Sequence, residues 1–402
     1  MLEGTRDDEL RDLADRFGTP LYVFDARSLR ARVDHLRRAL PRGTGFCYAA
    51  KANTFVLPAI EPLVDRVEAC SPGECRICSS CDVPGEKVVV SGVNKDAGML
   101  EWVLDAYDEL AAVTIESRAQ LGLVREAARA SGRCLPVLLR LASGSQFGLD
   151  RASLVGAARE LAAAGEVELV GLQLFSGTQK TSQRRVRREL EALDALACEI
   201  GESCGRSVPL VEYGPGLPVA YFEGEDVGEP LLLEGLSEAL GAMRFGGDVV
   251  LELGRSLVAS CGTYLTSVVD AKEVAGQRYA IVDGGMHHLV YYGRSMALRR
   301  PLCHTLPPRP GGPACEAGTW SVCGSLCSTN DVLAKQVPFE ALGVGTVLAF
   351  ERAGAYCATE GMSLFLSRDL PRVVGVGQDG APRLLRDVVP TSPLNAPRER
   401  WG

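Results

Sequence analysis

The chain has 402 residues, of which 46% are hydrophobic and 23% are charged. This composition is typical of a soluble globular protein and excludes a disordered or fibrous chain, and the length favours two domains. The 51 acidic and 43 basic residues give a formal net charge of -8, which disfavours nucleic acid and anionic membranes as partners.

The N-terminal segment does not have the pattern of an export signal. Acidic residues such as Glu3, Asp7 and Asp8 stand where a signal peptide carries basic and then apolar residues, and no later window has about 18 unbroken apolar residues. We therefore expect a cytoplasmic protein without a membrane segment. Its 14 cysteines are then expected to be reduced thiols that pack as small hydrophobic side chains.

Short β-rich runs alternate with amphipathic stretches from about residue 20 to about residue 250, and 26–39 and 185–200 are predicted helices. Alternation repeated about eight times predicts a parallel sheet, which at this length closes into a (β/α)8 barrel. The predicted strands are 21–24, 45–49, 87–91, 112–115, 136–140, 169–173, 210–213 and 249–253.

After about residue 255 the pattern changes. Strands follow one another at 264–269, 279–282 and 345–350 without regular helices between them, which predicts a separate β domain. We therefore place the barrel at residues 24–255, and the β domain at residues 1–23 and 256–402.

Four cysteines, Cys70, Cys75, Cys78 and Cys81, have the spacing C-x4-C-x2-C-x2-C, which is close to that of iron–sulfur ligands. The simpler interpretation is a helix over 74–81, whose buried face carries thiols at positions three apart. We favour the helix and predict no metal site.

Lys51 follows the predicted strand 45–49 in the run Y-A-A-K-A-N. Its amine would project at the C-terminal mouth of the barrel, where such folds carry out their chemistry. Alone this is a weak indication, because most lysines are solvated surface groups. Later strand ends have to be considered with it.

Two later strand ends carry complementary groups. Gly214 and Gly216, in G-P-G, would let backbone N–H groups approach a phosphate, and Glu252 and Arg255, in E-L-G-R, add a carboxylate and a cation. A lysine, a carboxylate and a phosphate site are what pyridoxal phosphate requires. The lysine binds its aldehyde carbon covalently, the carboxylate keeps its ring nitrogen protonated, and the glycines anchor its phosphate.

The sequence resembles a known family, the fold-type III pyridoxal phosphate decarboxylases that act on diaminopimelate, ornithine and arginine. The resemblance runs from Pro20 to about Val376. The matching segments are Y-A-A-K-A-N around Lys51, S-P-G-E at 71–74, G-V-N-K at 92–95, Q-F-G at 146–148, G-T-Q at 177–179, G-P-G at 214–216, E-L-G-R at 252–255, D-G-G-M at 283–286, G-S-L-C at 324–327 and G-A-Y at 354–356.

The resemblance implies an alanine-racemase-like (β/α)8 barrel, a C-terminal β-sandwich or β-barrel domain, and a homodimer with shared active sites. Lys51 would carry the cofactor and Glu252 would contact the pyridine nitrogen. Cys327 would enter the site from the second subunit of a head-to-tail dimer and donate a proton to Cα after carbon dioxide has left. The implied phosphate contacts are Gly214, Gly216, Arg255 and Tyr356, and Gly254 is a further implied cofactor contact.

The chain departs from the family pattern at the cofactor ring. Where relatives have a histidine stacked on the ring, this chain has Phe175, which can pack there but cannot hydrogen-bond. Leu253 replaces a proline, which should be tolerable. The loop between Arg140 and Gln146 is nearly deleted, so we expect a more open mouth.

A second departure concerns the substrate. Relatives that act on ornithine or diaminopimelate carry an acid just after the active-site cysteine, whereas Ser328 follows Cys327 here. Serine cannot neutralise a distal ammonium, so ordinary diamines are poor candidates, and the basic run 294–300 would suit an anionic distal group. The predicted substrate contacts are Arg294, Ser328 and Asp331.

The run D-G-G-M-H-H and the short cysteine motif look most similar to biosynthetic-cluster members of the family. Those decarboxylate modified substrates, such as glutamate bound to an acyl-carrier protein or a citryl-linked diaminopropionate. We predict a pyridoxal phosphate enzyme that removes the α-carboxylate of an amino acid or a derivative, and leave presentation by a carrier protein open. The alternatives are a racemase on the same barrel and a regulatory homologue without activity. His287 and His288 are equally well interpreted as substrate contacts or as structural or solvated histidines.

Overall fold

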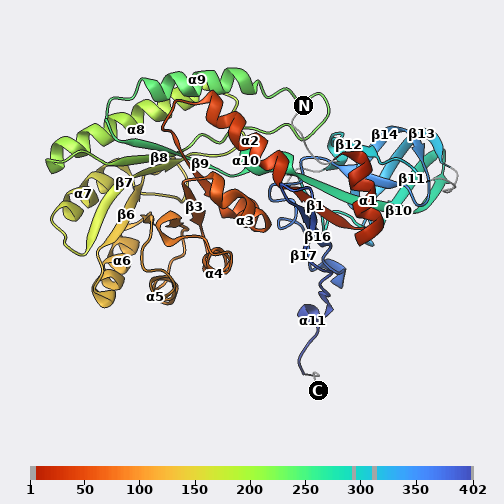
Figure 1. Cartoon of the computed structure of the whole chain (residues 1–402), viewed down its shortest axis with the longest axis horizontal. Helices are drawn as coiled ribbons and strands as arrows, with labels where there is room; N and C mark the ends of the chain where they lie inside the picture. Colours follow the sequence, from red (N-terminus) through yellow and green to blue (C-terminus); the bar gives the residue numbers. More distant parts are fainter. Residues whose placement is uncertain (1–5, 292–295, 310–314, 400–402) are drawn as a thin grey trace. The chain divides into compact units, whose positions relative to one another are not determined.

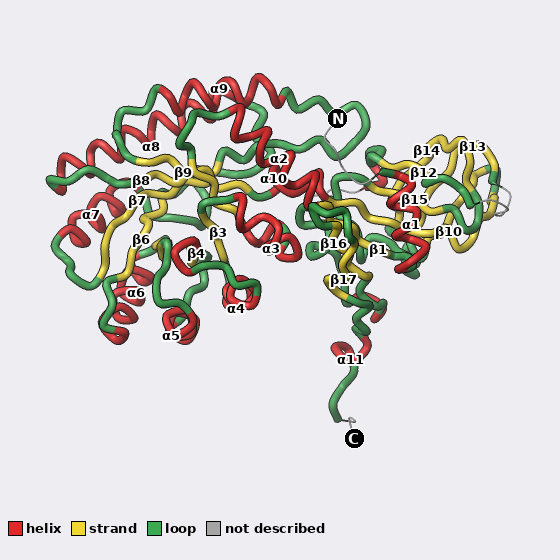
Figure 2. The backbone as a smooth tube through the Cα atoms, viewed as in Figure 1, coloured by secondary structure: helices red, strands yellow, loops and turns green. Residues whose placement is uncertain are grey.

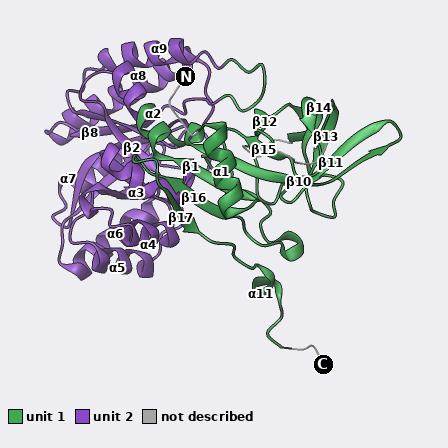
Figure 3. Cartoon of the chain, turned by 45° about the vertical axis from the view of Figure 1, so that its right-hand side comes forward, with its two compact units in different colours: residues 1–32, 220–226, 258–402 green, residues 33–219, 227–257 purple. Residues whose placement is uncertain are grey.

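The computed structural model describes residues 6–291, 296–309 and 315–399. The chain forms two compact units (Figure 3). Residues 33–219 and 227–257 make up the barrel unit, and residues 1–32, 220–226 and 258–402 make up the β unit. The barrel unit begins at residue 33 and ends at residue 257. Our domain limits of 24 and 255 stay a prediction.

Parallel strands close into a barrel in the barrel unit, which confirms the predicted fold class, and its helices lie outside the strands (Figure 1). The barrel closes where β2 pairs with β9, with Gly45 opposite Val250. The strands are β2 (Gly45–Ala49), β3 (Arg66–Ala69), β4 (Val88–Val90), β5 (Ala112–Ile115), β6 (Leu135–Arg140), β7 (Val167–Phe175), β8 (Leu210–Gly214) and β9 (Asp248–Leu253). The main helices are α4 (Pro72–Ser80), α5 (Ala97–Ala106), α6 (Arg118–Ser131), α7 (Arg151–Ala162), α8 (Gln183–Cys204) and α9 (Glu229–Gly241).

One predicted barrel strand was wrong and another was missed. The run 21–24 forms β1 (Leu21–Asp25), which pairs with strands of the β unit instead of the barrel. All of its residues are buried, and a fully buried run looks the same in a barrel and in a covered sheet. The missing barrel strand is β3, whose four residues include the charged Arg66 and Glu68. Such a short, half-charged run gives almost no periodic signal.

The cysteine-rich segment forms a helix, as predicted. Ser71 caps α4 by accepting a hydrogen bond from the N–H of Glu74, with 3.1 Å between Oγ and N, and Pro72 opens the first turn. Cys75 and Cys78 are completely buried on the inner face of α4. Among the described residues, no group of three or more His, Cys, Asp and Glu side chains is arranged to hold a metal.

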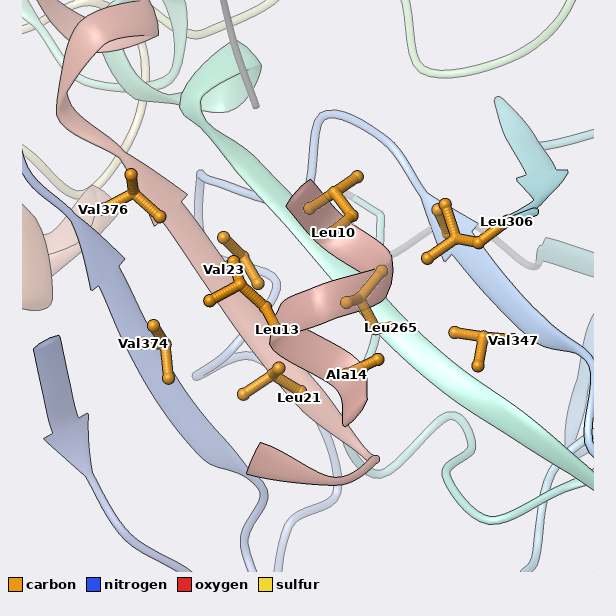
Figure 4. Packing of buried hydrophobic residues seen from close by; sticks show 11 residues of the cluster. Leu10, Leu13, Ala14, Leu21, Val23, Leu265, Leu306, Val347, Val374 and Val376 are labelled. Carbon is orange, nitrogen blue, oxygen red and sulfur yellow. The ribbon is translucent and has the colours of Figure 1, made fainter. Parts of the chain in front are cut away.

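The β unit contains a mixed sheet in the strand order β14-β13-β11-β10-β1-β16-β17, with β15 paired to β10 and β12 to β15. Its core joins α1 (Asp7–Phe17) to the sheet: Leu10 and Leu13 pack with Leu21, Val23 and Leu265 (Figure 4). The remaining strands are β10 (Gly262–Val274), β11 (Gln277–Val282), β12 (Cys303–Thr305), β13 (Glu316–Cys323), β14 (Val332–Leu342), β15 (Val347–Phe350), β16 (Arg372–Val376) and β17 (Pro382–Arg386). Secondary structure is coloured in Figure 2.

The interior of the barrel is only partly apolar. Cys47, Leu138 and Val250 belong to a packed apolar layer, but Gln173 and Glu212 are also completely buried. Gln173 donates a hydrogen bond to Glu212, with 2.7 Å between Nε2 and Oε1. Burial, with added repulsion from Glu68, raises the pKa of Glu212 to about 7. None of the helices in the described ranges combines the length and apolar character needed to cross a bilayer.

The raised pKa of Glu212 predicts a pH-dependent stability. An unfolded glutamate titrates near 4.5, so between that pH and about 7 the folded protein binds more protons and its stability falls as the pH rises. Glu212→Gln removes this loss, because the amide does not titrate. The free energy of unfolding of the variant minus that of the wild type should therefore be roughly 1–3 kcal/mol larger at pH 8 than at pH 5. Thermal unfolding at both values checks this; an equal difference at the two values would contradict it.

Candidate active site

Lys51 faces two carboxylates at the mouth of the barrel. It lies in the short turn η1 (Ala50–Ala52) directly after β2, and its Nζ donates a hydrogen bond to Glu68 Oε2 over 2.7 Å. Glu252 Oε1 lies 3.5 Å from the same nitrogen, and Cys70 Sγ 3.6 Å. The lysine side chain is 38% exposed, whereas the carboxylates are almost completely buried. The amine therefore lies beside two buried carboxylates, while part of the lysine side chain stays exposed.

The two carboxyl groups differ in charge. Burial opposes ionisation of Glu68, but the ion pair and hydrogen bond with Lys51 outweigh it and hold the pKa of Glu68 well below its usual range. Burial raises the pKa of Glu252 well above its usual range, and repulsion by Glu68 adds to this. Among the described residues, Glu252 Oε2 has no hydrogen-bond partner although it is buried. A buried oxygen of this kind fits a cationic N–H donor such as a protonated pyridine.

Glu68 was not predicted from the sequence. It is on β3, the strand that was missed, and its carboxylate is the nearest one to Lys51 Nζ among those described. The available signal was a period-two alternation in R-V-E-A-C just before the matched S-P-G-E segment. With only two apolar residues in four, that signal was too short to use.

The glycine turn after β8 is tightly packed. Gly216 has a φ of +60°, and a Cβ there would lie 2.2 Å from the carbonyl oxygen of Gly177. A Cβ at Gly214 would lie 2.2 Å from Cδ2 of Phe175. The N–H groups of Gly216 and Leu217 donate no hydrogen bond within the described residues. Free N–H groups on a turn without side chains form a fitting cradle for a phosphate.

Other predicted cofactor contacts also lie at strand ends in the barrel unit. Phe175 is the last residue of β7 and pairs in register with Gly214. Gly254 follows β9, and the almost buried Arg255 begins the short helix α10 (Arg255–Val258). The barrel therefore brings together Lys51, Phe175, Gly214, Gly216, Glu252, Gly254 and Arg255 at the carboxyl ends of its strands.

A second buried ion pair at these strand ends was also missed. Arg140, the last residue of β6, lies 3.4 Å from Glu116, with Nη1 and Oε2 as the nearest atoms, and its guanidinium lies over the ring of Phe147 at 4.7 Å. Both charged residues are less than 10% exposed. Phe147 directly follows the shortened loop between Arg140 and Gln146, so its ring packs on the guanidinium at the end of β6.

The β unit carries the remaining predicted residues. Cys327 is exposed in the loop between β13 and β14. Asp331 holds this loop, because it accepts hydrogen bonds from the N–H groups of Met286 at 2.7 Å and Leu326 at 2.8 Å. Ser328 and Asp331 line a cavity of about 880 Å³. The roles of these residues toward substrate stay predictions.

Two predicted residues remain. Tyr356 is partly buried and has a φ of +65°, in a turn that begins with the tightly packed Gly354. Arg294, the predicted cation for substrate, lies outside the described residues. The contacts of these two residues with cofactor and substrate therefore stay predictions.

Comparison with known proteins agrees with this geometry. The chain is 26% identical over 402 residues to an L-glutamyl-[BtrI acyl-carrier protein] decarboxylase from Niallia circulans, with 94% of this chain and 93% of the relative covered. It is 31% identical over 385 residues to a diaminopimelate decarboxylase from Deinococcus radiodurans, covering 92% and 93%. The crystal structure of a diaminopimelate decarboxylase from M. jannaschii in complex with L-lysine superposes with a TM-score of 0.83 at 25% identity, covering 96% and 93%.

A family model described as pyridoxal-dependent decarboxylase, C-terminal sheet domain, matches residues 21–354. This match spans both units and includes Lys51, Glu252 and Cys327. The unpartnered oxygen of Glu252 and the glycine turn fit the cofactor that the family uses. The chain therefore belongs to the family of pyridoxal phosphate-dependent amino-acid decarboxylases.

Proposed function

We propose that Lys51 carries pyridoxal phosphate and that Glu252 keeps its ring nitrogen protonated while the α-carboxylate of an amino-acid derivative is removed. The observation that carries this proposal is the amine of Lys51 beside two buried carboxylates, one with an unpartnered oxygen. When bound, the cofactor supplies an electron sink for the electron pair of the bond that breaks as carbon dioxide leaves.

Each remaining residue has a definite task in this proposal. Glu68 holds the amine of Lys51 in place through the hydrogen bond and ion pair between Oε2 and Nζ, which lie 2.7 Å apart. Phe175 packs on one face of the cofactor ring. Cys327 of the partner subunit donates a proton to Cα after decarboxylation. The phosphate is bound by Gly214, Gly216, Arg255 and Tyr356, and Gly254 is a further cofactor contact.

We also propose that the substrate is a modified or carrier-bound amino acid without a distal ammonium group. Ser328 offers no negative charge to such an ammonium, and both carboxylate oxygens of Asp331 already accept hydrogen bonds from backbone N–H groups, those of Met286 and Leu326. The Niallia circulans relative is named for a glutamyl group on an acyl-carrier protein, which is a substrate of this class. The relatives reported above are named decarboxylases, which favours this proposal over a racemase or a regulatory homologue.

Glu252→Gln separates cofactor binding from catalysis. Lys51 is intact in this variant, so we expect the absorption band near ~420 nm that borohydride abolishes to persist. A neutral amide cannot keep the ring nitrogen protonated, so the rate of carbon dioxide release should fall by at least about 100-fold. Glu252→Asp, which keeps the charge, should lose less. A Glu252→Gln enzyme with wild-type turnover would contradict the proposal.

Measuring carbon dioxide release and optical rotation together tests the racemase alternative, because a racemase would change only the optical rotation.

Mixing inactive variants tests the shared active site. In a shared site, Lys51 comes from one subunit and Cys327 from the other. A mixed dimer of Lys51→Ala and Cys327→Ala subunits therefore has one site with both residues intact and one site with neither. We expect recovery of roughly a quarter of wild-type activity per subunit from random exchange of equal amounts. Lys51→Ala mixed with Glu252→Gln is the control, because both changes fall on the same side and no site is restored. Equal results from the two mixtures would exclude a shared site.

Ser328→Glu tests the basis of substrate choice. A new carboxylate at this position should favour substrates with a distal ammonium, raising kcat/KM for ornithine or diaminopimelate relative to a glutamyl substrate by about fivefold or more. Thr329→Glu, at the neighbouring exposed position, controls for added charge in the same loop. No change in the ratio, or the same change in both variants, would contradict a specific role for Ser328.

A further inference from the structure

Lys180 holds both ends of the glycine turn. It lies in the segment between β7 and α8, and its side chain is 1% exposed. Its Nζ donates to the carbonyl oxygen of Gly214 over 3.0 Å, and its backbone N–H donates to the carbonyl oxygen of Gly216 over 2.9 Å. A single residue therefore fixes the first and last carbonyl groups of the three-residue turn.

The ammonium of Lys180 is itself fixed by Glu189 of α8. Glu189 Oε2 accepts hydrogen bonds from Lys180 Nζ and from the Tyr213 hydroxyl, each over 2.8 Å, and Oε1 accepts one from Ser176 over 2.6 Å. Burial opposes ionisation of Glu189, but these donors outweigh it and bring its pKa to about 2. Burial lowers the pKa of Lys180, against the attraction of Glu189. A buried ion pair contributes little net stability, so stability alone does not explain it.

The two carbonyl bonds act differently on the turn. The carbonyl of Gly214 belongs to the peptide with Pro215, which has no N–H, so this bond fixes the start of the turn, whereas the bond to Gly216 sets the direction of an N–H group. In a trans peptide the C=O and N–H bonds point in opposite directions. Because the carbonyl of Gly216 points toward the backbone of Lys180, the N–H of Leu217 points away from it. Within the described residues, neither this N–H nor that of Gly216 donates a hydrogen bond. Lys180 thus lies behind the surface that these N–H groups present.

We infer that Lys180 is a positioning residue for the phosphate group, which presets the N–H groups of Gly216 and Leu217 for an incoming phosphate. The inference rests on the proposed cofactor site and adds to it a residue that does not touch the cofactor. Without the side-chain bond, the carbonyl of Gly214 loses the ammonium of Lys180 and the start of the turn loses an anchor, so the turn can shift and carry its N–H groups away from the phosphate. Binding of the phosphate should weaken, whereas contacts to the ring should not.

The test compares pyridoxal phosphate with pyridoxal, which lacks the phosphate. Dissociation constants of both are measured on the full-length apoenzyme by absorbance. The dissociation constant of pyridoxal divided by that of pyridoxal phosphate reports the contribution of the phosphate alone. In Lys180→Met, which keeps the backbone N–H but has no donor on its side chain, we expect this ratio to fall about tenfold or more. Lys95→Met is the matched control. Lys95 is also buried, and it donates to the carbonyl of Gly92 over 2.6 Å, in another loop, so its ratio should stay at the wild-type value.

A wild-type ratio in folded Lys180→Met would overturn the inference. If that variant does not fold, Lys180→Gln decides, because its neutral amide can still donate but is shorter; we expect a ratio at least about threefold below wild type, and an unchanged ratio would overturn the inference. Failure of the proposed function looks different, because the wild-type apoenzyme would then bind neither compound with a new absorption band.

Discussion

The ammonium of Lys51 and the buried carboxylate of Glu68 form the ion pair on which the site depends. Inside a protein such a pair interacts more strongly than in water, but removing either partner leaves an uncompensated charge. The pair also acts on a third group: burial raises the pKa of Glu252, the charge on Glu68 raises it further, and the ammonium of Lys51 opposes both effects. A cofactor whose cationic ring nitrogen donates a hydrogen bond to the unpartnered oxygen of Glu252 would stabilise the ionised form of this carboxyl group.

The carboxyl ends of the barrel strands bring these groups together because the strands are parallel and closed. Lys51 follows β2, Glu68 is on β3 and Glu252 is on β9, and both β3 and β9 pair with β2. The lysine is therefore flanked by one carboxylate from each neighbouring strand. The glycine turn follows β8, which pairs with β9 on the far side of Glu252. Glu252, the proposed partner of the ring nitrogen, and the glycine turn, the proposed phosphate site, are thus on adjacent strands.

The sequence allowed most of the barrel and part of the site to be predicted. Lys51, the glycine turn and Glu252 could be found because each stands in a motif at the end of a clear strand. Glu68 could not, because β3 is short and half charged, and its importance comes from pairing with β2. Asp331 shows a different limit: its predicted contact with substrate stays a prediction, and its hydrogen bonds to backbone N–H groups could not be predicted because no motif reveals them. Lys180 likewise acts through contacts that no spacing predicts.

The most direct test of the account is the identity of the lysine that binds the cofactor. The enzyme loaded with pyridoxal phosphate is reduced with borohydride and digested, and its peptides are identified by mass spectrometry. The account predicts the cofactor mass on the peptide that contains Lys51, with none on the peptides that contain the buried Lys95 and Lys180. Modification of either buried lysine instead, or no modified peptide from an enzyme that releases carbon dioxide, would contradict it.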